Sequence, residues 1–135
     1  MTPDTAESSL ATVRRFMAAT GAERMNERRS LLHDEFVLHE AGGLPFSGDY
    51  HGPHGFFELL NRMNDVLDLR AGPIAIDPLG DNAVAARFRL TFISRASGNS
   101  VEMGLVEIYT VLDGRIAELD VYYKDPASVA ELLST

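Results

Sequence analysis

The sequence predicts an α+β fold in which a curved antiparallel sheet wraps around N-terminal helices. In the first part of the chain, apolar residues recur with the spacing of helices, whereas the C-terminal half alternates with the period of two that is typical of strands. Asp113-Gly114 joins two β-rich runs, which indicates a hairpin, because a type I′ turn needs positive φ at both central residues. Helices packed at the mouth of such a sheet would leave a cone-shaped cavity, the usual place for a ligand.

Two helices are expected near the N-terminus. Residues 4–19 form the first, with Asp4 or Thr5 as its cap and an apolar stripe on one side. Residues 22–33 form a shorter second helix. Two arginines of this helix are expected to face solvent: Arg28 and Arg29.

Two further helices are predicted from prolines at their first positions. Gly52-Pro53 starts a third helix, because proline is well suited to the first helical position. The apolar face of that helix includes Phe56. Asp125-Pro126 precedes a last helix over residues 126–133.

Three segments before the hairpin are assigned from local pattern. Residues 36–40 form a short strand, and residues 41–50, rich in glycine and proline, form a loop. Residues 69–79 form a broken strand, since the two prolines in it cannot donate to a ladder and suit a sheet edge. Residues 84–93 alternate cleanly and form a half-buried strand.

The two-residue turn fixes the register of the hairpin, so that Glu107 faces Asp120 and Thr110 faces Ala117. One face of the hairpin then carries Val101, Met103, Leu105, Glu107, Tyr109, Val111, Ile116, Glu118, Asp120 and Tyr122. The other face carries Val106, Ile108, Thr110, Ala117, Leu119, Val121 and Tyr123.

Glu107 and Asp120 are the only break in the first, mostly apolar face. If that site is dry, the pKa of one carboxyl rises and the group stays protonated, which would make it a proton donor or acceptor. Alternatively the patch faces water and both groups are ionised. A bulge between Val101 and Leu112 would shift the pairing.

His39 is a further acid/base candidate, because its strand should line the cavity and an imidazole titrates near neutral pH. It could equally be a core histidine bonded to a backbone carbonyl. Glu40 points to the opposite face if the strand is regular, where it would be exposed or pair with an arginine. His51 and His54 flank the start of the third helix, but their spacing matches no metal motif, so no metal is expected.

Composition limits the classes of function. The 135 residues carry a net charge of −8, with 45% hydrophobic and 24% charged residues, which is typical of one globular domain over residues 1–135. The acidic balance argues against nucleic acid and against an anionic membrane surface. The chain has no cysteine, and no apolar run is long enough to span a membrane. We expect a soluble cytoplasmic protein without a cofactor.

Three motifs resemble those of the SnoaL-like proteins of the nuclear transport factor two-like superfamily. They are Phe36-Val-Leu-His39-Glu40, Tyr50-His-Gly52-Pro-His-Gly55 and Val106-Glu-Ile-Tyr-Thr-Val-Leu-Asp-Gly114-Arg-Ile116. The resemblance covers almost the whole chain. It implies a cystatin-like α+β barrel and a single SnoaL-like domain, with polyketide cyclases and ketosteroid isomerase as relatives.

The resemblance also implies roles for single residues. Phe16 matches the tyrosine with which ketosteroid isomerase stabilises an oxyanion, and a phenyl ring cannot donate. The general base of the isomerase falls near His39, and its protonated aspartate falls on Glu107. Asp120 resembles the acid/base residue of the SnoaL-like cyclases. Steroid isomerisation is therefore not expected here.

The leading hypothesis is a cofactor-independent acid/base enzyme of the isomerase, cyclase or hydratase type that acts on a small apolar molecule. Its predicted catalytic residues are Asp120, Glu107 and His39. Its predicted ligand-binding residues are Tyr109, Tyr122, Phe16, Tyr50 and Phe56. The alternative is a non-catalytic protein of the same fold that binds a small molecule or serves in an assembly.

The second face of the hairpin is apolar, and no helix is left to cover it. An apolar sheet of this size usually marks a protein interface. We therefore expect a two-fold homodimer that packs sheet to sheet, as the resemblance also implies.

Overall fold

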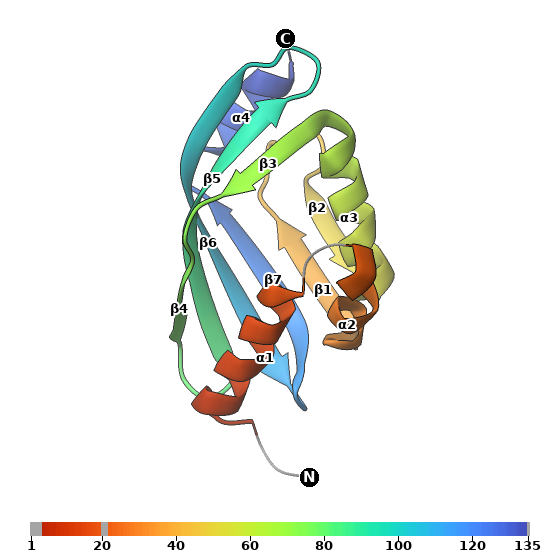
Figure 1. Ribbon diagram of the computed structural model, residues 1–135, viewed down its shortest axis with the longest axis vertical. Helices are drawn as coiled ribbons and strands as arrows, with labels where there is room; N and C mark the ends of the chain where they lie inside the picture. The colour runs from red at the N-terminus through yellow and green to blue at the C-terminus, as the bar shows by residue number, and fades with distance from the viewer. Residues whose placement is uncertain (1–3, 20–21, 135) are drawn as a thin grey trace.

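The computed structural model describes residues 4–19 and 22–134, and it confirms the α+β prediction (Figure 1). One seven-stranded sheet curves around helices α1 (Ala6–Ala18) and α3 (Gly52–Val66). The strands are β1 (Leu32–Glu40), β2 (Gly48–His51), β3 (Leu67–Ala71), β4 (Ala75–Pro78), β5 (Ala83–Ser94), β6 (Ser100–Leu112) and β7 (Arg115–Tyr123). Their order is β2-β1-β7-β6-β5-β3, with β4 also beside β5. All pairs are antiparallel except β1 and β7, which are parallel.

The start of the described chain is tied at two points. Thr5 caps α1, because its hydroxyl accepts from the backbone N–H of Ser8 and the Ser8 hydroxyl accepts in return from that of Thr5. Asp4 holds the hairpin turn instead of the helix. Its carboxylate oxygens accept from the N–H of Asp113 at 2.7 Å and of Gly114 at 3.0 Å. The N-terminal segment thus lies against a turn that is more than a hundred residues away in sequence.

The second helix is shorter than the pattern predicts. A 3₁₀ turn, Ala22–Arg24, leads into α2 (Met25–Ser30), and the chain then enters β1 at Leu32. The residues predicted as the last turn of this helix belong to the sheet instead. The carbonyl of Leu31 accepts from the N–H of Ile116 on β7. The segment predicted as a loop likewise holds a short strand, β2, which pairs with β1.

The broken edge strand is confirmed. Both β3 and β4 pair with β5, one after the other along the same edge. Gly72 and Pro73 lie in the break, where Gly72 donates its N–H to the carbonyl of Arg89. The last helix, α4 (Pro126–Leu133), also begins where expected, with the Asp125 side chain accepting from the N–H of Ser128.

The hairpin has the predicted turn but not the predicted register. Asp113 and Gly114 have φ of 54° and 74°, and Val111 pairs with Ile116. The register then shifts, so that Thr110 pairs with Glu118, and Ala117 is the extra residue of a β-bulge. This bulge lies in the second strand of the hairpin.

One extra residue turns every later side chain of β7 to the other face. Leu119, Val121 and Tyr123 point into the core, although the pattern placed them outside. Tyr122 was expected inside, and it is 55% exposed on the outer face. Glu107 pairs with Val121 and not with Asp120, so the predicted Glu107–Asp120 couple is wrong.

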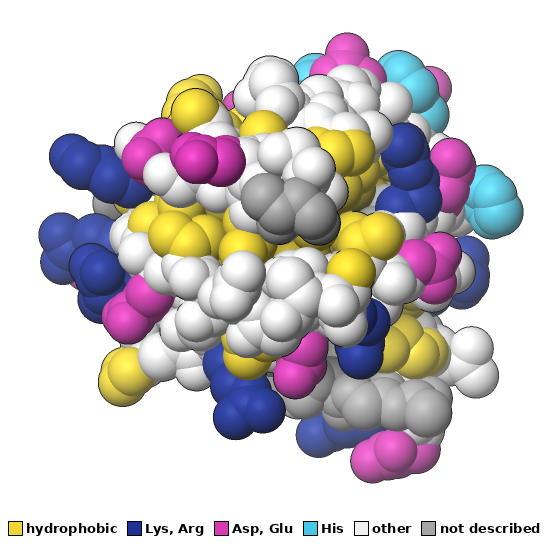
Figure 2. All heavy atoms as spheres, turned by 90° about the horizontal axis from the view of Figure 1, so that it is seen from above, with side chains coloured by type: hydrophobic (Ala, Val, Ile, Leu, Met, Phe, Trp, Pro, Cys, Tyr) yellow, Lys and Arg dark blue, Asp and Glu magenta, His cyan; other side chains and the backbone are white. Residues whose placement is uncertain are grey.

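The core lies between the inner face of the sheet and the helices α1 and α3. Gly55 allows α3 to approach the sheet closely, since a Cβ there would lie 2.8 Å from the backbone carbon of Tyr50. α4 packs at the end of β5 and β6 through Val129, which is fully buried. Figure 2 looks onto this end, where hydrophobic side chains surface among interspersed acidic and basic ones.

Candidate functional site

A cavity of about 120 Å³ lies between α3 and the inner face of the sheet. Its wall is mostly apolar, with contributions from Leu38, Phe56, Leu59, Leu60, Met63, Leu69, Phe88, Leu90, Leu105, Leu119 and Val121. Three polar side chains also line it: Glu40, Glu107 and Tyr123. An apolar pocket with a few convergent polar groups is the usual form of a small-molecule site.

Glu107 projects from β6 into this cavity. Burial raises the pKa of its carboxyl, and the hydrogen bond from Tyr109 and the charge of Arg28 offset part of the rise. The Tyr109 hydroxyl donates to Glu107 Oε1 at 2.8 Å. Tyr109 is itself only 2% exposed, so this hydrogen bond lies in otherwise apolar surroundings behind the cavity wall.

Glu40 projects from the end of β1 into the same cavity, which corrects the expectation that it points away. Burial raises the pKa of its carboxyl to about 7, and Glu107 adds to the rise. Two donors hold the carboxyl in place. The N–H of Ala41 donates to Oε1 at 2.8 Å, and the Tyr123 hydroxyl donates to Oε2 at 3.0 Å.

The structure therefore places two half-buried carboxyls in one cavity, but the second is Glu40 and not Asp120. Desolvation raises the pKa of both carboxyls, and the charge of Glu107 adds to the rise at Glu40. A carboxyl with a pKa near 7 can both take and give a proton at neutral pH. This arrangement supplies acid/base chemistry.

Arg28 is the basic group whose charge lowers the pKa of Glu107, and it is half-buried, although it was predicted to face solvent. Its guanidinium lies 4.6 Å from the ring centre of Phe16 and 5.0 Å from that of Phe56. Desolvation lowers its pKa, while Tyr109 and Glu107 raise it. Arg29, by contrast, is exposed and lies over the Phe57 ring.

His39 and Asp120 lie on the outer face of the sheet, although both were expected in the cavity. His39 is held by two carboxylates: Nδ1 lies 2.7 Å from Asp49 and Nε2 lies 3.0 Å from Glu118. These bonds raise the pKa of His39. The pKa of Asp120 is also raised, first by burial and then by Glu118. The predicted catalytic trio is thus split between the two faces of the sheet.

The predicted ligand-binding aromatics also separate. Phe56 lines the cavity, while Phe16 is fully buried and packs edge-on against it at 5.2 Å. Tyr50 anchors a loop, because its hydroxyl donates to the carbonyl of Phe46 and accepts from Arg62. Tyr122 lies on the outer face.

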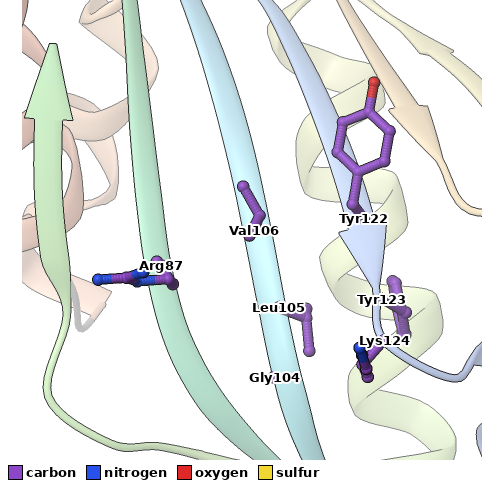
Figure 3. Close-up of a pocket in the computed structure, with 7 residues that line it drawn as sticks. All are labelled: Arg87, Gly104, Leu105, Val106, Tyr122, Tyr123 and Lys124. Atoms are coloured by element: carbon purple, nitrogen blue, oxygen red, sulfur yellow. The ribbon is translucent and has the colours of Figure 1, made fainter. Parts of the chain in front are cut away.

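Two hollows of the molecular surface lie near the cavity. One, of about 330 Å³, is lined by Glu40, His39 and Asp120, so Glu40 borders both the cavity and this outer hollow. The other, of about 370 Å³, lies beside Gly104, where the last residues of β7 approach β6 (Figure 3). Gly104 leaves room there, because a Cβ added to it would meet nothing within 4 Å.

Two residues of the site, Glu40 and Arg28, were missed by the reasoning from sequence. Phe36 and Leu38 share the parity of Glu40 in the strand, so the apolar alternation of β1 already placed that carboxyl inside. Arg28 lies three residues after Met25 on α2, at the spacing of a shared helix face. The position of Arg28 on the same helix face as the apolar Met25 could therefore have indicated that this arginine faces the core.

The geometry defines a class of protein: a curved sheet and helices that enclose an apolar cavity with buried carboxyls. Residues 13–119 match the model of the SnoaL-like domain, which is most of the chain. The chain belongs to the SnoaL-like family. No curated protein matches the sequence. No described helix is both long and apolar enough to cross a membrane.

Solved structures agree with this fold at low sequence identity. An NTF2-like protein of Burkholderia xenovorans has a TM-score of 0.83 and 16% identity, covering 93% of this chain and 97% of its own. A protein provisionally named a polyketide cyclase, from Xanthomonas campestris, has a TM-score of 0.77 and 16% identity, covering 94% and 98%. TerC, co-crystallised with polyporic acid, has a TM-score of 0.79 and 17% identity, covering 95% and 99%.

Proposed function

We propose that this protein is a cofactor-independent acid/base enzyme that acts on a small, largely apolar molecule next to a carbonyl group. The observation that carries the proposal is that two half-buried carboxyls, Glu40 and Glu107, line one apolar cavity and both have a raised pKa. Several structures with the same fold are provisionally named polyketide cyclases, which supports chemistry of this kind.

Glu40 is the acid/base residue in this proposal. A pKa of about 7 leaves a large share of the carboxyl ionised at neutral pH, and the ionised form takes a proton from the carbon beside the carbonyl. The C–H electron pair moves into an enolate, and the proton stays on Glu40. Return of that proton to another carbon gives isomerisation. In cyclisation the enolate carbon attacks a second carbonyl carbon, and the oxygen of that carbonyl takes the proton from Glu40.

Glu107 is the hydrogen-bond donor to the enolate oxygen. Its raised pKa favours the neutral form, and a neutral carboxyl can donate one hydrogen bond. Tyr109 already donates to Oε1, which orients the group. In this role Glu107 takes the place of the oxyanion donor that Phe16 cannot supply.

Deuterium exchange tests the proposal without a known substrate. A panel of cyclic ketones and 1,3-diketones is incubated with the protein in D₂O, and NMR follows loss of the hydrogen next to the carbonyl. We expect exchange above buffer background for members of the panel that fit the cavity, and we expect Glu40→Gln to abolish it. Exchange that Glu40→Gln leaves unchanged would refute the role of Glu40.

A non-catalytic binding protein is the second candidate. TerC has the same fold and was crystallised with polyporic acid, which supports ligand binding in this architecture. Phe16 is also without a donor group. This candidate predicts that ketones perturb the cavity signals in NMR spectra while no hydrogen exchanges.

We further propose that the outer sheet face forms a two-fold homodimer. Val106 and Ile108 are half-buried on this face, and Tyr122 is exposed. Arg87 projects from the same face (Figure 3), and none of the described residues forms an ion pair with it. In the proposed dimer the two-fold axis passes between Arg87 and the acidic residues Glu118 and Asp120 of this face, so that each copy's Arg87 meets the other's carboxylates.

Sedimentation velocity at micromolar concentration tests the dimer. Ile108→Asp would place a charge in the interface opposite Ala85 and Asp120, where no cation faces it directly, so we expect it to give monomers, while the exposed Leu79→Asp control stays dimeric. A wild-type protein that sediments as a monomer would refute the proposal.

A further inference from the structure

The side chain of Arg28 is a half-buried cation, and no carboxylate of the described residues lies close enough to pair with it. Among the residues that the structure describes, its Nε is the one buried side-chain nitrogen or oxygen without a hydrogen-bond partner. No ion pair within 4.0 Å joins it to a described carboxylate. An arginine stays protonated in proteins, so the positive charge remains in place. Buried N–H donors are normally hydrogen-bonded, which makes this one unusual.

Two aromatic rings fix the orientation of the guanidinium. Phe16 and Phe56 lie 4.6 and 5.0 Å from its central carbon. Such contacts satisfy the flat face of a guanidinium and leave the N–H groups along its edge to find acceptors. The edge of a guanidinium matches two oxygens of a carboxylate, in a bidentate pair.

Arg28 is also connected with the cavity. Phe56, which touches the guanidinium, is part of the cavity wall. The charge of Arg28 acts on Glu107, a polar residue of the same wall, and on Tyr109, which donates to Glu107 from behind that wall. Since Glu107 holds its proton more tightly than an exposed glutamate, it is a poor counter-ion for Arg28.

We propose that Arg28 binds the negatively charged oxygens of a small organic anion, and that the natural ligand is a carboxylic acid with an apolar body. This inference rests on the proposed use of the cavity as a ligand site and adds the chemical class of the ligand. The anion supplies acceptors to the edge of the half-buried guanidinium, which has no hydrogen-bond partner among the described residues, and neutralises its charge. The apolar body fills the space beside Phe56 and Met63.

Benzoate and its neutral analogue benzamide test this proposal, because they differ mainly in charge. The ¹³C-labelled methyl group of Met63, which lines the cavity, reports binding in NMR titrations. We expect the wild type to bind benzoate at least about tenfold more tightly than benzamide. We expect Arg28→Met to lose this preference, because methionine keeps an apolar chain between the rings and removes the charge.

Two further variants separate charge, geometry and folding. Arg28→Lys keeps the charge without the planar fork, so it should retain only part of the preference. Arg29→Met is the matched control on the same helix, where the guanidinium is exposed over Phe57, and it should bind both probes as the wild type does. Melting curves show which variants are folded.

Three results would overturn the proposal. They are equal binding of benzoate and benzamide by the wild type, full benzoate preference in folded Arg28→Met, and benzoate titrations that leave the Met63 methyl unmoved. Failure of the proposed enzyme activity has a different signature. In that case the ketone panel shows no exchange, while the preference for benzoate persists in the wild type and in Glu40→Gln.

Discussion

The hydroxyl of Tyr123 donates to Glu40 Oε2 at 3.0 Å, which joins the last residue of β7 to the last residue of β1 inside the cavity. Tyr123 points inward because the bulge at Ala117 reverses the parity of β7. The ring of Tyr123 also stacks on Phe92 at 5.5 Å. The orientation of the proposed acid/base residue therefore depends on a single inserted residue in the neighbouring strand.

Replacing Glu40 by glutamine should stabilise the protein above neutral pH. The folded-state pKa of about 7 exceeds the ordinary 4.5, so the folded protein binds more protons than the unfolded chain between these values. The free energy of unfolding of the wild type therefore falls as pH rises from about 4.5 to 7, by up to roughly 3 kcal/mol from this group. Urea unfolding between pH 4 and 8 measures it, and Glu40→Gln should flatten the curve.

The control is Glu35→Gln, an exposed position on the same strand. It should leave the pH dependence as in the wild type. A Glu40→Gln curve parallel to the wild type would show that Glu40 titrates normally and would contradict the raised pKa.

Removing the Tyr123 hydroxyl should raise the pKa of Glu40 further. The hydrogen bond from Tyr123 favours the ionised carboxyl, so Tyr123→Phe removes a contact that holds the pKa down. Carbon-detected NMR of the glutamate carboxyl carbons follows the midpoint. Tyr122→Phe, one residue away on the exposed face, should not move it. An equal shift in both variants would argue against the direct bond.

Deletion of Ala117 should strongly destabilise the fold. Without the bulge, the regular register would turn Leu119, Val121 and Tyr123 to the outer face. Full burial of one such side chain contributes about 1.5–3 kcal/mol, so the loss should exceed about 4 kcal/mol. Chemical denaturation measures it, with Ala117→Gly as a control that keeps the chain length. A deletion variant as stable as that control would show that the register tolerates the shift.

Asp49→Asn should lower the pKa of His39 and leave Glu40 unaffected, because the two groups lie on opposite faces of the sheet. The hydrogen bond to Asp49 is the main cause of the raised pKa of His39. A raised histidine pKa stabilises the fold at acidic pH, and this contribution is lost as pH rises through the folded-state pKa. Imidazole NMR measures the shift. A changed Glu40 midpoint in Asp49→Asn would contradict the separation of the two clusters.

The sequence was sufficient for the fold because local signals and the family resemblance agreed. The turn at Asp113-Gly114, the proline-broken edge strand and the cap at Asp125 all have the predicted form. The cavity face was not predictable in the same way. A period-of-two argument depends on an uninterrupted count, and Ala117 carries no mark in its side chain that distinguishes a bulge from a regular strand position.

The missed site residues have a different physical origin. The pattern argument treated His39 as the functional group of β1 and assigned Glu40 to the other face by alternation, although Phe36 and Leu38 favour the opposite orientation. The assignment of Arg28 to solvent followed the general rule for charged residues. The two rings that contact its guanidinium come from α1 and α3. This contact therefore forms only when α1, α2 and α3 pack together, and no local sequence pattern predicts it.

The position of Glu40 between the inner cavity and the outer hollow lets one carboxyl serve two environments. In the proposed mechanism, a proton removed from an enclosed molecule would pass through this group to bulk water while the molecule stays in place. Isotope from the solvent could therefore enter the product without release of the intermediate, and turnover would not have to wait for the cavity to open.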